Sequence, residues 1–340
     1  MVRRVEQSSV VLAVLLCFAF GYYISNIGGG LNVDEVWHAE AGYALVGKGN
    51  IFFWPNVIAH PPLWRYVIGT SQLAFGRESL GVRFPSVIFA VLTIATLYWL
   101  CREIWGRLVG LIASFALLFS PFFGTFAVEG TPDMAGAFFS GTLLLLGVLI
   151  LKTGISTRRV VLIGLFTGLA LGDSYQMVAI ALPVLLTIYG FRESRPSMTQ
   201  SCLLFLAGFG TLALTFAPYL PTPIESARYF LSPLADLPGY ASMFSMMTPW
   251  AYLQSLRDYT EFSLYGLVLG HALLLLRRTR ARLLLLFAAD TYLLAIALVP
   301  VRYARYLLPL LLPTTALLFG FTADLTLLFG TLFTVGRIRD

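Results

Sequence analysis

The stretch NVDEVWHAEAGYAL, residues 32–45, contains three carboxylates and a histidine within a window of seven residues: Asp34, Glu35, His38 and Glu40. Acids grouped in this way suit general base catalysis on a hydroxyl or amine. They also suit the binding of a divalent cation that neutralises a phosphate. If residues 34–47 form a helix, Asp34 and His38 share one face and Glu35 points elsewhere. Acids that simply favour the positive end of a helix dipole would explain the same pattern, so both interpretations stay open.

A second pair of acids, Glu129 and Asp133, lies in VEGTPDMAGAFF, a short connection between two apolar runs. Carboxylates at the edge of a membrane are costly, and they usually face a cavity or a partner. Three arginines are the basic counterpart: Arg83 in LGVRFPS, and Arg302 and Arg305 in VRYARYLLPLLLP. Each of them either extends toward lipid headgroups or holds a lipid phosphate through paired hydrogen bonds.

The elements that must position these residues are membrane helices. The chain of 340 residues is 58% hydrophobic and 12% charged, with a mean hydropathy of +0.81, whereas soluble proteins carry about a quarter charged residues. Continuous apolar runs exclude a β-barrel, whose strands alternate. The sequence therefore predicts an all-α polytopic membrane protein of about ten transmembrane helices. We place them at about 9–27, 82–104, 107–125, 132–152, 158–172, 174–190, 200–220, 260–276, 282–299 and 303–320. Residues 158–190 are either two helices broken near Gly172-Asp173 or one long helix.

The distribution of charge predicts the orientation. With both termini in the cytoplasm, fifteen Lys and Arg residues lie on the cytoplasmic side and eight outside, as the positive-inside rule requires. Eleven of the seventeen acids then fall on the outer face of a multi-pass protein of the cell membrane. We expect one transmembrane domain over residues 1–340. Its first outer loop, 28–81, carries short interfacial helices, and its second outer loop spans 222–258. The positive net charge follows from the short cytoplasmic loops, so it does not indicate nucleic acid.

Five motifs in this order resemble the GT-C glycosyltransferases, specifically the protein O-mannosyltransferases and the lipid A aminoarabinose transferases. An Asp-Glu pair follows the first span, then come a His-Pro-Pro-Leu element and a Gly-x-Arg-x-Pro-Ser helix start. A second acid precedes the fourth span, and a late span begins with Arg-Tyr-Leu-Leu-Pro. Here they read VDEVWHAEAGYAL, HPPLWRYVIG, GVRFPS, TPDMAGAFF and RYLLPLLLP. The resemblance covers about residues 10–190 and 302–320.

The resemblance implies an inverting enzyme that moves a sugar from a polyprenyl-phosphate donor to an acceptor at the extracytoplasmic membrane face. It implies catalytic acids, with Asp34 as the first candidate for the base, Glu35 next, and Asp133 orienting the acceptor or a metal. It also implies contacts to the donor phosphate from His60, Arg83, Arg302 and Arg305. His38, Glu40 and Glu129 remain candidates for orienting the acceptor or a metal.

Several points stay open from the sequence. No ligand set has the spacing of a metal site, so no cofactor is identified, although the acids leave room for a divalent cation. The acceptor is a lipid, a glycan or a protein. A transporter or lipid flippase is the alternative function, and its support is Asp290 within a span and the Gly172-Asp173 break. A non-catalytic relative that has kept the fold is a third hypothesis, against which the intact Asp34, Asp133 and Arg305 argue.

Overall fold

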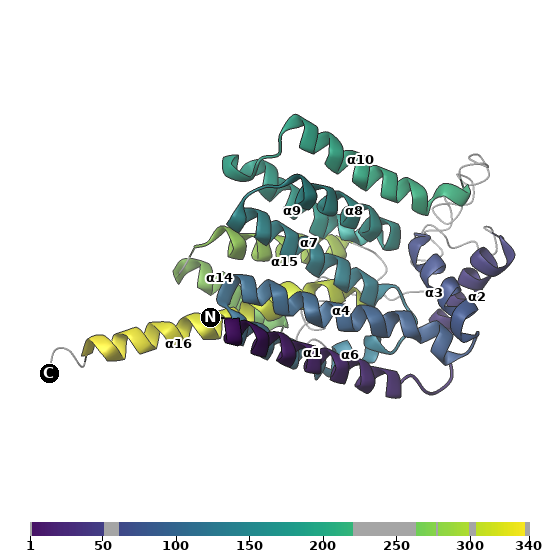
Figure 1. Cartoon of the computed structure of the whole chain (residues 1–340), viewed down its shortest axis with the longest axis horizontal. Coiled ribbons are helices and arrows are strands. Elements are labelled where there is room, and N and C mark those ends of the chain that lie inside the picture. The colour runs from purple at the N-terminus through teal and green to yellow at the C-terminus, as the bar shows by residue number, and fades with distance from the viewer. Residues whose placement is uncertain (1, 51–60, 220–262, 277, 299–303, 337–340) are drawn as a thin grey trace.

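The computed structural model describes residues 2–50, 61–219, 263–276, 278–298 and 304–336, and all regular elements in these ranges are helices. The long helices run side by side as a bundle, and two shorter helices, α2 and α3, lie across one end of it (Figure 1). The α-helices are α1 (Val2–Ser25), α2 (Val33–Lys48), α3 (Leu63–Phe75), α4 (Ser79–Trp105), α5 (Arg107–Leu118), α6 (Pro121–Ala127), α7 (Asp133–Thr153), α8 (Thr157–Asp173), α9 (Val178–Gly190), α10 (Met198–Thr215), α14 (Ser263–Leu276), α15 (Arg280–Leu298) and α16 (Leu308–Gly336). Short 3-10 turns cover Tyr175–Met177, Arg192–Ser194, Ala217–Tyr219 and Ala304–Leu307.

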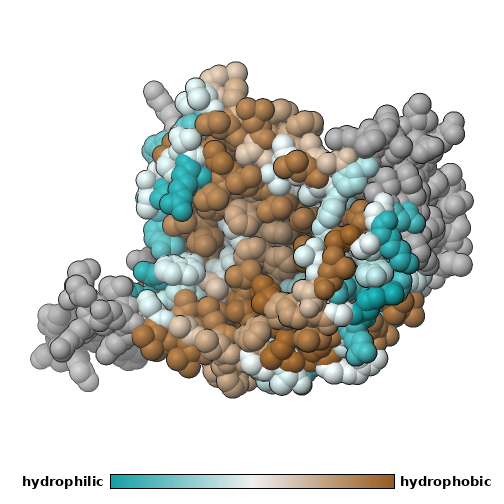
Figure 2. All heavy atoms as spheres, turned by 45° about the vertical axis from the view of Figure 1, so that its right-hand side comes forward, coloured by the Kyte–Doolittle hydropathy of each residue, from teal (hydrophilic) through white to brown (hydrophobic). Residues whose placement is uncertain are grey.

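Helix α7 is the central element of the bundle. It packs against α4, α8, α9, α15 and α16, and most of its side chains are buried. Helix α10 is at the other extreme, because it packs mainly on α8 and leaves large apolar residues such as Phe205 and Leu214 exposed. One face of the molecule is a broad apolar surface with hydrophilic residues along its two margins (Figure 2). An apolar band of this kind is what lipid requires of a helical membrane protein.

Four of the described helices are long and apolar enough to cross a membrane, or five when α5 and α6 count as one bent span. The expected span at 107–125 is bent by 68° between these two helices. Ser120 causes the break, because its side chain caps α6 through the Phe123 N–H at 3.2 Å, and Pro121 opens the new helix.

Helix α8 ends at Asp173 and α9 begins after a 3-10 turn, so residues 158–190 form two helices and the single long helix is wrong. Asn32 caps α2 through a capping box: its side chain accepts from the Glu35 N–H at 2.9 Å, and the Glu35 side chain accepts from the Asn32 N–H at 2.8 Å. The second outer loop, 222–258, lies outside the described residues.

Helices α2 and α3 form a close pair that covers one end of the bundle. A Cβ atom on Gly69 would lie 2.3 Å from the Gly42 carbonyl oxygen, so the two backbones touch where only glycine fits. Trp64 and Ile68 are buried side chains of α3. The two acids that begin α2 pair with arginines of other elements, Glu35 with Arg83 of α4 and Asp34 with Arg305 of the 3-10 turn Ala304–Leu307.

Candidate active site

Glu35 and Arg83 form a buried ion pair that anchors the segment leading into α2. Glu35 is 0% exposed, and the guanidinium of Arg83 grips both of its oxygens, with Nε–Oε1 at 2.6 Å and Nη2–Oε2 at 2.7 Å. The remaining N–H groups of Arg83 donate at 2.8 Å to the carbonyls of Ile27, Gly28 and Gly30. All five N–H donors of an arginine are thereby used within the protein.

The same carboxylate positions the loop that carries the second pair of acids. The Gly130 N–H donates to Glu35 Oε1 at 2.8 Å, and the buried Trp64 indole donates to the Gly130 carbonyl at 3.3 Å. Gly130 lies so close to α4 that a Cβ atom there would be 2.5 Å from Val82 Cγ1. Asp133 follows three residues later as the first residue of α7. The loop, α2 and α4 are therefore held as one unit.

Arg305 joins the two acids that the sequence singles out. Its Nη1 donates to Asp34 Oδ2 at 2.6 Å, and its Nε lies 3.6 Å from Asp133 Oδ2. The second contact is an ion pair without a hydrogen bond, since Asp133 Oδ2 is buried and has no hydrogen-bond partner among the described residues. The Asp34 side chain is 38% exposed, whereas those of Asp133 and Arg305 are largely buried. Asp34 is thus the acid of this cluster that an incoming molecule can reach.

Glu129 and Glu35 titrate differently because their surroundings differ. Burial raises the pKa of Glu129 to about 7, and the neighbouring charges of Glu35 and Asp133 add to the rise. Burial would also raise the pKa of Glu35. The hydrogen bonds from Arg83, Asn32 and Gly130 outweigh that effect and hold the pKa below its ordinary value. Glu35 is therefore a fixed anion, while Glu129 changes charge near neutral pH.

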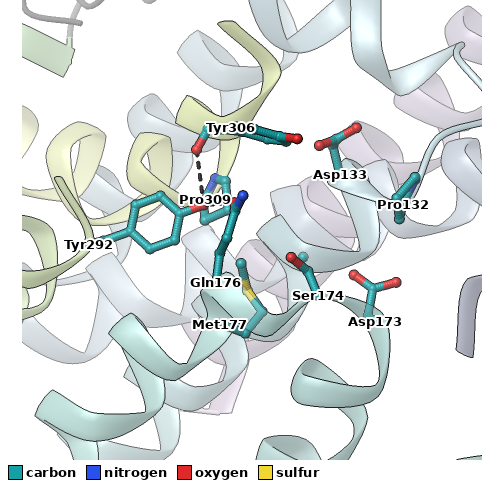
Figure 3. Close-up of a pocket in the computed structure, with 10 residues that line it drawn as sticks. Pro132, Asp133, Asp173, Ser174, Gln176, Met177, Tyr292, Tyr306 and Pro309 are labelled. Carbon is teal, nitrogen blue, oxygen red and sulfur yellow. Dashed lines mark hydrogen bonds between the residues drawn. The ribbon is translucent and has the colours of Figure 1, made fainter. Parts of the chain in front are cut away.

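A small cavity of about 30 Å³, with room for about one or two water molecules, lies behind Asp133. It is lined by Asp133 and Gly136 of α7, Asp173 at the end of α8, and residues of the following turn, of α15 and of the start of α16. Asp133 and Asp173 lie on the same side of it, and the ring of Tyr306 extends toward Asp133 (Figure 3). The Tyr292 hydroxyl closes the opposite wall, since it donates to the Tyr306 carbonyl at 2.9 Å.

The predicted site residues fall into three groups. Asp34, Asp133 and Arg305 meet in one cluster, with Glu129 close enough to interact with it electrostatically. Glu35 and Arg83 bind each other beside it, His38 is buried in α2, and Glu40 pairs with Arg77 at the surface. His60 and Arg302 lie outside the described residues, so their roles stay predictions.

Three contributors were not assigned to the site from sequence. Gly130 and Trp64 fix the loop of residues 128–132, and Asp173 lines the cavity. The signal for Asp173 was its position at a helix break, where it had supported only the transporter alternative. Asp290, the other support for a transporter, pairs with His271 at 3.2 Å, and both side chains are about half exposed.

The described residues do not form a metal site. They contain no group of three or more His, Cys, Asp or Glu side chains that could hold an ion. Asp34 and Asp133 are both paired with Arg305, whose positive charge occupies the position that a cation would take between them.

Known proteins are similar to this chain in two ways: a family resembles part of its sequence, and solved structures resemble its fold. The sequence model of the family described as dolichyl-phosphate-mannose-protein mannosyltransferase matches residues 59–221. No curated protein matches the sequence. Among solved structures, ArnT from Cupriavidus metallidurans, bound to undecaprenyl phosphate, is similar with a TM-score of 0.70 at 15% identity. The match covers 93% of this chain and 59% of ArnT.

The archaeal oligosaccharyltransferase AglB from Archaeoglobus fulgidus, in complex with an inhibitory peptide and a dolichol-phosphate, is also similar. Its TM-score is 0.61 at 15% identity, over 96% of this chain and 51% of AglB. This chain thus spans between one half and three fifths of the length of these two proteins. The chain is a multi-pass membrane protein with the GT-C fold, as the resemblance of the motifs predicted, and residues 59–221 are similar in sequence to the dolichyl-phosphate-mannose-protein mannosyltransferases.

Proposed function

We propose that the protein is an inverting glycosyltransferase that takes a sugar from a polyprenyl-phosphate donor. The observation that carries this proposal is the contact of Arg305 with both Asp34 and Asp133 at one end of the bundle. A guanidinium fits phosphate oxygens, and an accessible carboxylate beside it fits a general base. The family match supports the reaction class, and the undecaprenyl phosphate and dolichol-phosphate of the two similar structures support the lipid carrier.

In this proposal Arg305 holds the donor phosphate and Asp34 takes a proton from the acceptor. The acceptor oxygen or nitrogen attacks the anomeric carbon of the sugar, the bond from that carbon to the phosphate oxygen breaks, and polyprenyl phosphate leaves. The phosphate must compete with Asp34 for Arg305, because the two side chains are hydrogen-bonded at 2.6 Å without the donor. Donor binding would therefore release Asp34 from Arg305 and leave its carboxylate available as the base.

Glu35 and Arg83 have a different role in this proposal from the one that the resemblance implies. Arg83 spends its five N–H groups on Glu35 and on loop carbonyls, so it positions Asp34 and the 128–132 loop rather than the phosphate. Asp34 and Glu35 are adjacent in sequence but separated by about 100° around the helix, so one faces Arg305 and the other Arg83.

The orientation in the membrane is part of the proposal. The positive-inside count supports about ten spans with cytoplasmic termini, and it puts the Arg305 cluster on the extracytoplasmic side of the cell membrane. Polyprenyl-phosphate sugars would then reach the site from the outer leaflet, and a lipid, glycan or protein acceptor would reach the exposed side of Asp34.

Sugar transfer by purified protein in liposomes tests the function. Labelled polyprenyl-phosphate sugars are supplied with a membrane extract as acceptor, and Asp34→Asn and Arg305→Lys are compared with wild type. Asp34→Asn should lower kcat by about a hundredfold or more, because the base is lost. Arg305→Lys should mainly raise the donor KM, because a single ammonium replaces the planar fork.

Glu78→Gln is the matched control, since Glu78 is an exposed acid at the start of α4, on the same end of the bundle. This substitution should leave sugar transfer unchanged. Turnover by wild type that Asp34→Asn leaves unchanged would remove Asp34 as the base. A folded wild-type protein that neither binds nor turns over any polyprenyl-phosphate sugar would contradict the function itself.

A further inference from the structure

His271 of α14 and Asp290 of α15 form a polar pair on the outside of the helix bundle. His271 Nε2 lies 3.2 Å from Asp290 Oδ2, and the two side chains are 53% and 47% exposed. The imidazole ring also contacts its own helix, because Nδ1 hydrogen-bonds the Leu267 carbonyl at 2.9 Å. The second carboxylate oxygen, Asp290 Oδ1, has no hydrogen bond from the described residues. The pair is therefore accessible from outside the bundle and can still accept a hydrogen bond.

The pair lies at the depth of the membrane interior. Helix α15 packs along α7 and α16, which are two of the helices long and apolar enough to cross a membrane. Asp290 lies about 15 Å along the helix axis from Arg280, the first residue of α15, and this is about half the thickness of the hydrocarbon layer. Lipid chains cannot hydrogen-bond such a pair, and ionisable side chains at this depth usually face a partner. The outer side of α14 and α15 thus requires a polar partner rather than lipid alone.

The exposed residues around the pair are arranged for contact with another helix. On α15 they recur along one line, at intervals of four, three and four residues: Leu283, Phe287, Asp290 and Leu294. Tyr265 and Val268 continue the exposed surface on α14. A line with this period is the seam along which helices pack at small crossing angles. We call this surface, with the His271–Asp290 pair at its centre, the α14–α15 face.

A second copy of the chain fits the α14–α15 face because the face is complementary to itself. Two copies that insert into the membrane in the same orientation can be related by a two-fold axis along the membrane normal. His271 and Asp290 are in contact, so they lie at one depth, and the axis puts the acid of each copy level with the base of the other. Asp290 Oδ1 can then accept from His271 of the second copy. An unrelated helix would have to supply both an acid and a base at this depth.

We propose that the chain forms a symmetric dimer in the membrane through the α14–α15 face, with His271 of each copy hydrogen-bonded across the interface to Asp290 of the other. The proposed sugar transfer does not use this surface, so the inference stands independently of that function. It also gives Asp290 a role that does not require transport, although this acid within a helix had supported the transporter alternative.

Energy transfer between donor-labelled and acceptor-labelled full chains tests the dimer in liposomes over a range of protein-to-lipid ratios. Wild type should associate. His271→Asp and Asp290→His each put two like side chains in both copies, so each variant alone should associate about tenfold or more weakly. A mixture of the two variants should associate about as strongly as wild type, because the acids of one copy then face the bases of the other.

Two phenylalanines provide the matched controls, since both are exposed on the surface of the bundle. Phe287→Ala lies on the α14–α15 face and should weaken the dimer. Phe205→Ala lies on α10, which packs mainly on α8, and should leave association unchanged. The melting temperatures of all four variants in detergent should stay near that of wild type, because the substituted side chains are about half exposed or more.

Several outcomes would overturn the inference. One is a wild-type protein that stays monomeric at every protein-to-lipid ratio. Another is association that His271→Asp and Asp290→His leave intact, or that a mixture of the folded variants does not restore, since both results place the interface elsewhere. An equal loss in Phe205→Ala would assign the association to α10. A photo-crosslinker at position 287 that captures a different membrane protein, and no second copy, would show that the face has another occupant. The assay contains no sugar donor, so none of these outcomes bears on the transferase.

Discussion

Replacing Arg83 with methionine should destabilise the end of the bundle where the acids meet. The substitution keeps an apolar stem of similar length but removes all five hydrogen bonds of the guanidinium. Glu35 would remain as a carboxylate at 0% exposure, with only the Asn32 and Gly130 N–H groups as donors. Taking one partner from a buried ion pair costs about 3–5 kcal/mol, because the remaining charge has no counterion.

The chain offers a matched control for this substitution on the neighbouring α2–α3 pair. Arg77 pairs with Glu40, but both side chains are more than 40% exposed, and such surface pairs contribute about 0–1 kcal/mol. Thermal unfolding of the purified protein in one detergent should therefore show a fall of several degrees for Arg83→Met and little change for Arg77→Met. The double variant Arg83→Met/Glu35→Gln should recover part of the loss, because it removes both charges.

Two results would refute this reasoning. One is a melting temperature for Arg83→Met that matches Arg77→Met, which would show that the buried pair contributes no more than an exposed one. The other is Arg83→Lys with unchanged stability and a weakened affinity for polyprenyl phosphate. That result would support the role implied by the family resemblance, in which Arg83 binds the donor phosphate.

Two further predictions concern the loop between α6 and α7. The pKa of Glu129 is about 7 in the folded protein against an ordinary value of 4.5, so the fold loses stability as pH rises from about 4.5 to 7. The melting temperature of Glu129→Gln should equal that of wild type near pH 4 and exceed it at pH 8. Equal melting temperatures at both pH values would contradict the raised pKa. Gly130→Ala should lower the melting temperature and sugar transfer together, because its Cβ would lie 2.9 Å from the Val82 carbonyl oxygen as well as 2.5 Å from Cγ1. Gly124→Ala, with its nearest contact at 3.9 Å, is the control, and an equal loss in both variants would contradict the steric cause.

Local features of this fold were predictable because their causes are local. Asn32 and Glu35 are three residues apart and form the capping box that their spacing indicates. The helical period of 3.6 residues likewise suffices to put Asp34 and Glu35 on different faces of α2. The bend after Phe119 had a local signal too, the Ser120-Pro121 pair, which a prediction based on continuous hydrophobicity does not register.

The partners of charged side chains were not predictable, because they are set by tertiary packing. An arginine at the start of a helix has the same local sequence whether it holds a phosphate or a glutamate, and the partner of Arg83 lies 48 residues earlier. Asp173 likewise resembles an ordinary acid at a helix end. Its proximity to Asp133 follows from the packing of α8 on α7 and from a cavity that no sequence pattern indicates.

The charges in the described cluster indicate what a phosphate site here still requires. Around Arg305 lie Asp34, Asp133 and Glu129, while Arg83 is occupied by Glu35. A phosphate about 5 Å from one of these carboxylates would be repelled by about 3 kcal/mol at an effective dielectric constant of about 20. Protonation of Glu129 near pH 7 relieves part of this repulsion. Further relief must come from additional cations, so the predicted roles of His60 and Arg302 at the donor phosphate, although still untested, are the ones that this charge balance most requires.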